Sequence, residues 1–199
     1  GFAVRAVLAA LGRGPRDVPG MTWVARDGTL EHHAPPPPSS LKGLPHPDLR
    51  GMGVEEYGYI PVHSSRGCIN ACGFCSERWY AKRFRTRPVG EVVDEMIAQA
   101  ERFGVTNFQF CDLLINSKAQ WLEAFCDRLV GLGTPFTWDS YFVPDGLTPG
   151  WGARLRHAGC PTVRVGMEHL VPRVRALMGR HGDVAEMEDN LVALAADGV

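Results

Sequence analysis

Long apolar runs are missing from this chain of 199 residues, and none reaches the roughly 20 residues that a membrane-spanning helix needs. Strong charge of either sign is missing as well, because 21 basic and 22 acidic side chains leave a net charge of −1. This balance gives no electrostatic reason to expect binding to nucleic acid or to an anionic membrane. The N-terminal stretch also lacks the cleavage signature of a signal peptide, since Arg5 and Arg13 bracket an amphipathic segment. We therefore expect a cytoplasmic protein with an ordinary globular core.

The six cysteines lack the distribution of a disulfide framework. Three of them, Cys68, Cys72 and Cys75, crowd into eight residues, while the others are scattered along the chain. Such crowding suits a metal site in a reducing compartment better than a set of disulfides. We expect the scattered cysteines to be small buried hydrophobes, namely Cys111, Cys126 and Cys160.

The N-terminal quarter of the sequence predicts a helix and a hairpin followed by a linker. Apolar residues recur at helical spacing over 2–11, and a hairpin over 18–33 turns at Asp27 and Gly28. The stretch 35–48 is rich in Pro, Ser and Gly, as linkers are. We place a domain boundary there, with one part over 1–48 and another over 49–199. The chain begins without Met and ends just after a helix stop, so we expect a fragment of a longer protein.

From about residue 57, strands alternate with helices. The pattern predicts strands over 59–64, 105–111, 136–141 and 162–166, with apolar helix stripes that belong to the core. Thr148 and Pro149 are expected to be the N-cap and first position of the third helix. Because each crossover between parallel strands needs a helix, this order predicts an α/β fold and a partial (β/α) barrel. Functional groups of such barrels gather where the strands end, so the cysteine loop, Cys111-Asp112 and Gly166-Met167-Glu168 should face one mouth.

The three crowded cysteines follow the first strand in a C-x3-C-x2-C pattern. Thiolates bind iron–sulfur clusters, and a compact loop can bring three of them to three irons. Gly67 and Gly73 allow the backbone to turn tightly. A zinc ion normally takes four ligands, and neither His63 nor another Cys completes an obvious set. Because no fourth Cys lies close by, one iron would lack a protein ligand and stay open for a substrate.

The motif SSRGCINACGFCSE resembles the signature of the radical S-adenosylmethionine (SAM) superfamily, in particular its cobalamin-binding subgroup. The upstream stretches DVPGMTWVARDGTL and LKGLPHPDL resemble that subgroup's connector between a cobalamin domain and the barrel. The downstream stretches FQFCDLLINSKAQWLEAFCDRL and LRHAGCPTVRVGMEHLVPRVRALMGR resemble its second and fourth βα units. The resemblance implies a truncated radical SAM barrel, preceded by the tail of a cobalamin-binding domain.

The resemblance also implies cofactors and residue roles. Cys68, Cys72 and Cys75 match the ligands of a [4Fe–4S] cluster that cleaves SAM to a 5′-deoxyadenosyl radical, with cobalamin as a further cofactor. The implied reaction is methyl transfer or another radical modification of the substrate. Phe74 matches the aromatic residue beside the SAM adenine, while Asp112 and Glu168 match positions near the SAM amino group and the ribose. No side chain is assigned a catalytic role. The implied partners are an unknown substrate, such as a small molecule, and an electron donor such as flavodoxin or ferredoxin.

Three positions depart from the family pattern. His169 replaces a Ser, Ile69 replaces a Pro, and Val143 stands where many members have Arg.

Several residues have alternative structural roles. Asp112 could instead be a helix N-cap or a solvated acid, Glu168 a helix-start carboxylate, and Phe74 a packing residue. The basic run Arg83, Arg85 and Arg87 is expected in a solvated loop. The alternative function is an iron–sulfur electron-transfer or redox-sensing module without SAM chemistry.

Overall fold

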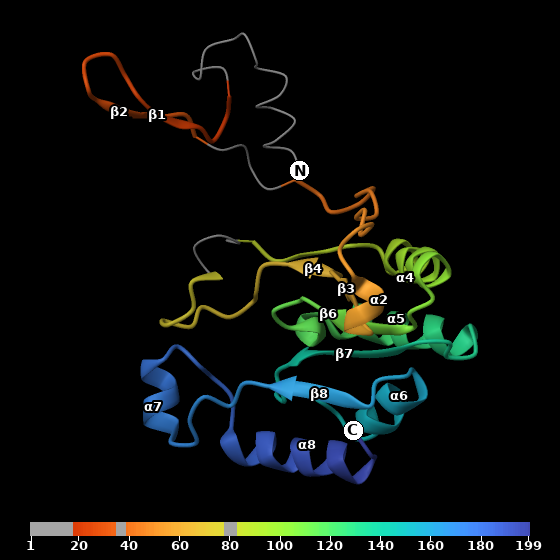
Figure 1. Ribbon diagram of the computed structural model, residues 1–199. Helices are drawn as coiled ribbons and strands as arrows, with labels where there is room; N and C mark the ends of the chain where they lie inside the picture. Colours follow the sequence, from red (N-terminus) through yellow and green to blue (C-terminus); the bar gives the residue numbers. More distant parts are fainter. Residues whose placement is uncertain (1–17, 35–38, 78–82) are drawn as a thin grey trace. The chain divides into compact units, whose positions relative to one another are not determined.

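The computed structural model describes residues 18–34, 39–77 and 83–199. It divides the chain into two compact units, Gly1–Ser39 and Ser40–Val199 (Figure 1). The helix expected over 2–11 and the prolines at 35–38 lie outside the described residues.

The smaller unit contains the expected hairpin. Strand β1 (Thr22–Val24) pairs antiparallel with β2 (Leu30–His32), so that Thr22 lies opposite His32. The Asp27 side chain accepts hydrogen bonds from the backbone N–H of Thr29 at 3.0 Å and from its hydroxyl at 2.7 Å. This Asx-type turn, with Gly28 at a φ of 85°, reverses the chain where the sequence predicted it.

The larger unit is built on a parallel sheet of four strands. Strands β3 (Ile60–Val62), β6 (Asn107–Phe110), β7 (Thr137–Phe142) and β8 (Thr162–Val165) lie side by side in chain order. All three pairings are parallel. This arrangement confirms the α/β fold class and the partial barrel that the alternation of strands and helices predicted.

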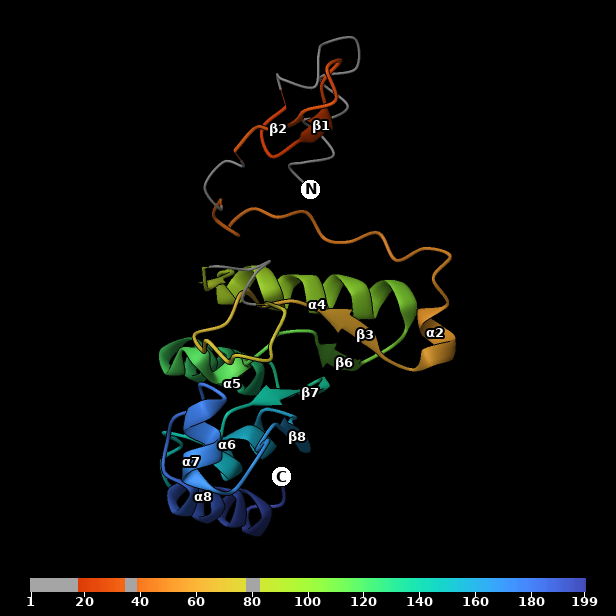
Figure 2. The ribbon, with the colours of Figure 1, turned by 90° about the vertical axis from the view of Figure 1, so that its left-hand side faces the viewer.

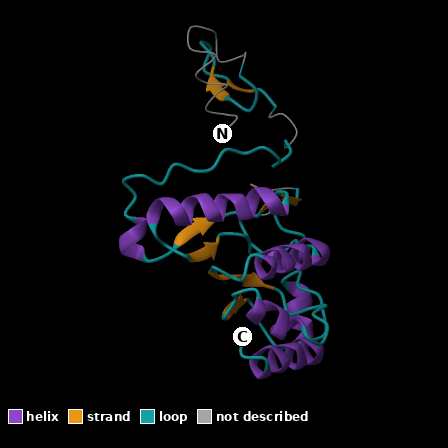
Figure 3. Cartoon of the chain, turned by 90° about the vertical axis from the view of Figure 1, so that its right-hand side faces the viewer, coloured by secondary structure: helices purple, strands orange, loops and turns teal. Residues whose placement is uncertain are grey.

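Helices connect the strands and cover one face of the sheet. Helix α4 (Val89–Phe103) follows β5 (Arg85–Thr86), α5 (Ala119–Gly131) follows the short η2 (Ile115–Ser117), and α6 (Trp151–His157) follows β7. Helices α7 (Pro172–Leu177) and α8 (Val184–Ala196) follow β8, and Asp183 caps α8 by accepting from the Ala185 N–H at 2.8 Å. Figure 2 shows α4 and α5 alongside β3 and β6, and Figure 3 shows the helices grouped beside the strands.

The core lies between this face of the sheet and its helices. Phe125 of α5 is fully buried and contacts Phe110, Trp121 and Trp138, with ring centroids 5.2 to 5.4 Å apart. Burial alternates along β7, where Trp138 faces the helices and Tyr141 faces the opposite side and is 47% exposed. Alternate residues of each strand therefore belong to the core, and the others to the open face.

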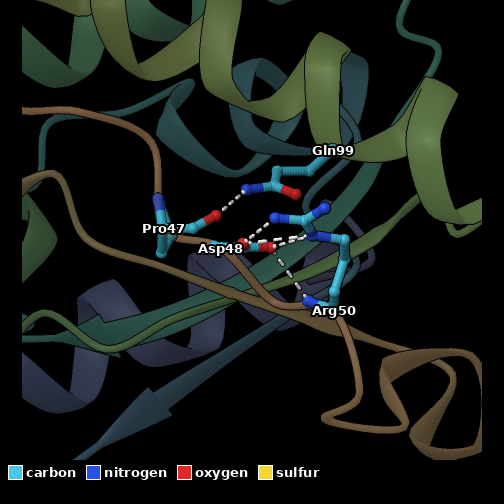
Figure 4. Close-up of polar contacts among 4 residues, drawn as sticks. All are labelled: Pro47, Asp48, Arg50 and Gln99. Atoms are coloured by element: carbon cyan, nitrogen blue, oxygen red, sulfur yellow. Dashed lines mark hydrogen bonds and ion pairs between the residues drawn. The ribbon is translucent and has the colours of Figure 1, made fainter.

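The segment 40–50, which the sequence grouped mainly with the linker, packs on the larger unit. Leu41 is buried, and the Gln99 side chain of α4 donates to the Pro47 carbonyl at 2.8 Å. Figure 4 shows this contact beside the Asp48 carboxylate, which accepts from Arg50 Nε at 2.9 Å. The division into units therefore falls after Ser39, whereas the sequence suggested a boundary after Asp48. Val54–Tyr57 form the short helix α2 before β3.

Two helix predictions need correction. Helix α6 begins at Trp151, because Trp151 N–H donates to the Thr148 carbonyl in a turn and Gly150 takes a left-handed φ of 91° at the N-cap. The apolar residues at α7 are not all core, since Leu177 is 79% exposed and Val171, directly before the helix, is 49% exposed.

Within the described ranges, no helix is long and apolar enough to cross a membrane.

Candidate functional site

The cysteine loop leaves the sheet at the C-terminal end of β3. Residues Ser65–Arg66 form β4, which pairs antiparallel with β5 and so closes the base of the loop. Gly67 takes a left-handed φ of 87°, which lets the chain turn into the loop. Cys72 is buried, and Cys68 and Cys75 are partly buried. All three thiols therefore belong to one loop, which follows the C-terminal end of β3.

The donor set of this loop suits a [4Fe–4S] cluster. The Asn70 N–H donates to the Cys68 sulfur at 3.4 Å, a contact that favours the thiolate. The pKa of the Cys68 thiol is nevertheless raised overall, mainly by burial. The other two thiols add to this rise, and the Asn70 N–H and Arg180 oppose it. Among the described residues, no three His, Cys, Asp or Glu side chains converge to hold a single metal ion. A cluster makes no such demand, because each of its ligands binds a different iron.

Asp112 holds the strand that leads into the cysteine loop. Its side chain is 2% exposed and accepts hydrogen bonds from the Ser64 N–H at 2.9 Å and the Ser64 hydroxyl at 2.7 Å. The Ser65 hydroxyl donates to the same carboxylate. Asp112 is therefore neither a solvated loop acid nor a helix N-cap. Its contact with SAM stays a prediction, made from a position directly under the loop.

Glu168 sits in a strained turn after β8. Its φ is 61°, and the next N–H, of His169, donates back to the Met167 carbonyl at 2.7 Å. This pattern is that of a γ-turn with a left-handed central residue, which costs about 1–3 kcal/mol in a residue with a side chain. Helix α7 begins only at Pro172, so Glu168 is not a helix-start carboxylate. Strain of this kind clusters at functional sites, where surrounding contacts hold it in place.

The turn after α7 joins the Glu168 segment to the cysteine loop. The Gly73 N–H donates to the Met178 carbonyl at 2.9 Å. A Cβ on Gly179 would lie 3.1 Å from the Ala71 carbonyl and 3.5 Å from the Cys72 Cα. Figures 1 and 2 both place α7 beside this loop. The structure thus brings together two site segments that are about a hundred residues apart in the sequence.

Phe74 projects from the same loop and is 54% exposed. It does not pack into the core, and an exposed aromatic ring at this place is available for stacking on a planar ligand. The contact with adenine stays a prediction.

Comparison with known proteins agrees with this geometry. The family model described as the radical SAM superfamily matches residues 62–199, well over half of the chain. The chain belongs to the radical SAM superfamily. The family resemblance that the cysteine motif suggested is thereby confirmed.

This radical SAM chain is similar to a bacteriochlorophyllide d C-12(1)-methyltransferase of Chlorobaculum tepidum. The two are 30% identical over 125 residues, which cover 61% of the chain and 27% of the relative. The chain therefore spans about a quarter of that curated relative.

Two solved structures share its fold. One is the radical SAM methyltransferase TsrM of Kitasatospora setae, solved with tryptophan and a SAM analogue, at a TM-score of 0.81 and 18% identity. The other is the cobalamin-dependent SAM radical enzyme OxsB with aqua-cobalamin bound, at a TM-score of 0.82 and 19% identity. The match covers 100% of the radical SAM chain in both cases, and 42% and 31% of the two structures.

A cavity of about 370 Å³ opens beside the cysteine loop of the radical SAM chain, at the ends of β3 and β6. Its walls carry mainly polar and charged side chains, together with one thiol: His63, Ser65, Arg66, Gly67, Glu77, Arg85, Cys111 and Leu113. It lies beside the predicted cofactor site, because Ser65, Arg66 and Gly67 lead directly into the cysteine loop.

Sequence reasoning missed the polar residues on this open face. Tyr141 of β7 lies opposite Arg164 of β8, and the Arg164 guanidinium carbon is 4.6 Å from the centre of the Tyr141 ring. Arg164 also pairs with the Asp139 carboxylate. The alternation of residues along β7 could have placed 139 and 141 on the same face of the strand. The sequence could not show that residue 164 of β8 lies beside them, because it does not reveal the register between strands.

Two further expectations about side chains were wrong. Arg87 is not solvated, because it is 5% exposed and forms an ion pair of 2.7 Å with buried Glu95 of α4. Cys111 is exposed, whereas Cys126 and Cys160 are fully buried as expected. Burial raises the pKa of each of these two buried thiols to about 12.

Proposed function

We propose that the chain is the core of a radical SAM enzyme in which Cys68, Cys72 and Cys75 bind a [4Fe–4S] cluster. The observation that carries this proposal is the placement of three thiols on one loop at the C-terminal end of β3. The loop 67–77 has no fourth Cys, so it supplies ligands for three irons and leaves one for SAM. When bound, the cluster supplies the electron that cleaves SAM into methionine and a 5′-deoxyadenosyl radical.

The chain's own residues bind and orient in this mechanism. Asp112 fixes Ser64 and Ser65 and so holds the base of the cysteine loop. Phe74 offers its ring to the adenine, and Glu168 directs its carboxylate toward the ribose of SAM. The polar cavity between His63 and Cys111 leaves room beside the loop for part of SAM or of the substrate.

We further propose cobalamin as a cofactor and methyl transfer to a small molecule as the reaction. Support comes from the methyltransferase relative and from the two cobalamin-dependent or methyl-transferring structures, which share this fold. Residues 1–48 then form the tail and connector of a cobalamin-binding domain. A flavodoxin or ferredoxin is the electron donor that such chemistry needs.

The test of SAM chemistry is electron paramagnetic resonance (EPR) of the intact, anaerobically reconstituted and reduced protein. We expect SAM to change the spectrum. Glu168→Ala should weaken that response more than the control Glu101→Ala, which changes an exposed residue of α4. If the cluster forms but its spectrum does not change when SAM is added, an electron-transfer or redox-sensing module is supported instead.

Cobalamin needs a separate measurement. We expect the intact protein to retain hydroxocobalamin through gel filtration, as read by its visible absorption. Loss of all cobalamin would withdraw this part of the proposal and leave SAM cleavage standing.

A further inference from the structure

A buried arginine of α7 holds the turn that carries Glu168. Arg175 is 3% exposed, and its Nη1 donates to the Met167 carbonyl at 2.7 Å and to the His169 carbonyl at 3.4 Å. Its Nη2 donates to the His181 carbonyl at 3.0 Å. One guanidinium thus fixes both neighbours of Glu168 and the exit of the same segment, which keeps the strained turn in place.

A second arginine, Arg180, holds the Glu168 side chain itself. Its Nη2 donates to Glu168 Oε1 at 2.9 Å, and the Arg180 side chain is only 13% exposed. The backbone supports this position, because the Arg180 N–H donates to the Arg175 carbonyl at 2.9 Å. A Cβ on Gly166 would lie 2.6 Å from Glu168 Oε1 and 3.3 Å from Arg180 Nη2, so the ion pair fills the space beside that glycine.

Arg180 also follows directly after the contact with the cysteine loop. Met178 accepts from the Gly73 N–H, and Gly179 lies against Ala71 and Cys72. The positive charge of Arg180 is therefore carried by the residue directly after the one that packs against Ala71 and Cys72 of the loop. Arg180 Nε is buried without a hydrogen-bond partner among the described residues. The Arg180 side chain is therefore held here although one of its donors stays unpaired.

We propose that Arg180 is a positioning residue that serves both halves of the site at once. It directs the Glu168 carboxylate toward SAM, and it keeps one fixed positive charge beside the cluster loop. The inference rests on the proposed function, since it assigns a role toward the cluster and SAM. A purely structural ion pair at a partly exposed position would contribute little to SAM binding or to the potential of the cluster.

The test compares Arg180→Gln and Arg180→Lys with Arg173→Gln, which changes an exposed arginine of α7, the helix that precedes Arg180. All are made in the intact protein, reconstituted anaerobically, and read by iron content, by the midpoint potential of the cluster, and by the Kd for SAM in an EPR titration. We expect unchanged iron content in all three.

The two Arg180 variants should separate charge from geometry. Arg180→Gln should give a more negative midpoint potential, because reduction adds a negative charge that Arg180 no longer offsets. Arg180→Lys keeps the charge and so the potential, yet it loses the planar fork of donors that holds Glu168. Both variants should raise the Kd for SAM at least tenfold, and Arg173→Gln should change neither property.

Several results would overturn the proposal. If Arg180→Gln leaves the midpoint potential and the Kd for SAM at the values of Arg173→Gln, the proposal is refuted. A fall in iron content equal to the loss of SAM binding would likewise show a role in folding alone. A wild-type protein without cluster or SAM response would instead refute the proposed function, and this inference with it.

Discussion

At the scale of single residues, the site depends on one buried carboxylate. Asp112 accepts three hydrogen bonds from Ser64 and Ser65, which lie 48 and 47 residues earlier in the sequence. The sequence could mark Asp112 as the residue after a strand, but it held no signal for these serine donors. Only the parallel pairing of β3 with β6 brings them together.

We expect Asp112→Asn to lower the free energy of unfolding by about 1–3 kcal/mol, because the amide group would turn donors toward buried donors. The measurement is urea unfolding, with the exposed Asp94→Asn as its control. Equal stability of the two variants would contradict the role of Asp112 as a structural acceptor.

The cysteines outside the loop should differ in reactivity. Burial raises the pKa of Cys126 and Cys160 to about 12, so only about one molecule in 10⁴ carries either thiolate at pH 8. The pKa of Cys111 is also raised, mainly by partial desolvation, but Cys111 is an exposed residue. Iodoacetamide at pH 8 should therefore label Cys111 first, as read by mass spectrometry of the native protein. Rapid labelling of Cys126 or Cys160 would show that their burial is wrong.

At the scale of elements, the periodicity of apolar residues predicted the helices and strands that local sequence determines. The four parallel strands, α4 with its stop at Gly104, and α8 with its Asp183 cap all follow the apolar spacing and capping residues of the sequence. Helix α6 was predicted too early, because Thr148 and Pro149 form a turn that resembles a helix start. The Arg87–Glu95 pair was missed, because burial of an ion pair depends on how α4 packs on β3.

The contact between α7 and the cysteine loop can be tested with a matched pair of glycines. Gly179 and Gly133 both have a left-handed φ, of 71° and 78°, but only Gly179 lies against the cysteine loop. Gly179→Ala and Gly133→Ala should each lose about 1–2 kcal/mol of stability from the backbone alone. Gly179→Ala should in addition lower the iron bound after reconstitution, because its Cβ would press on the Ala71 carbonyl. Equal iron content in the two variants would contradict a role for this contact in shaping the loop.

At the scale of the whole molecule, the sequence predicted the family correctly but not the contacts that hold the candidate site. The spacing of Cys68, Cys72 and Cys75 pointed to a cluster, and membership of the radical SAM superfamily agrees with it. The sequence could not show that Arg175 and Arg180 hold Glu168, or that Met178 contacts the cysteine loop. Those contacts join residues that meet only once β8 and α7 have packed beside the other strands.

The central claim is that these three cysteines bind one [4Fe–4S] cluster. Its most direct test is the iron and sulfide content of the intact protein after anaerobic reconstitution. We expect about four irons and four sulfides per chain. We expect almost none in Cys68→Ala/Cys72→Ala/Cys75→Ala, and a full complement in the control Cys111→Ala/Cys126→Ala/Cys160→Ala. Full iron and sulfide in the first triple variant would show that these three cysteines do not bind the cluster.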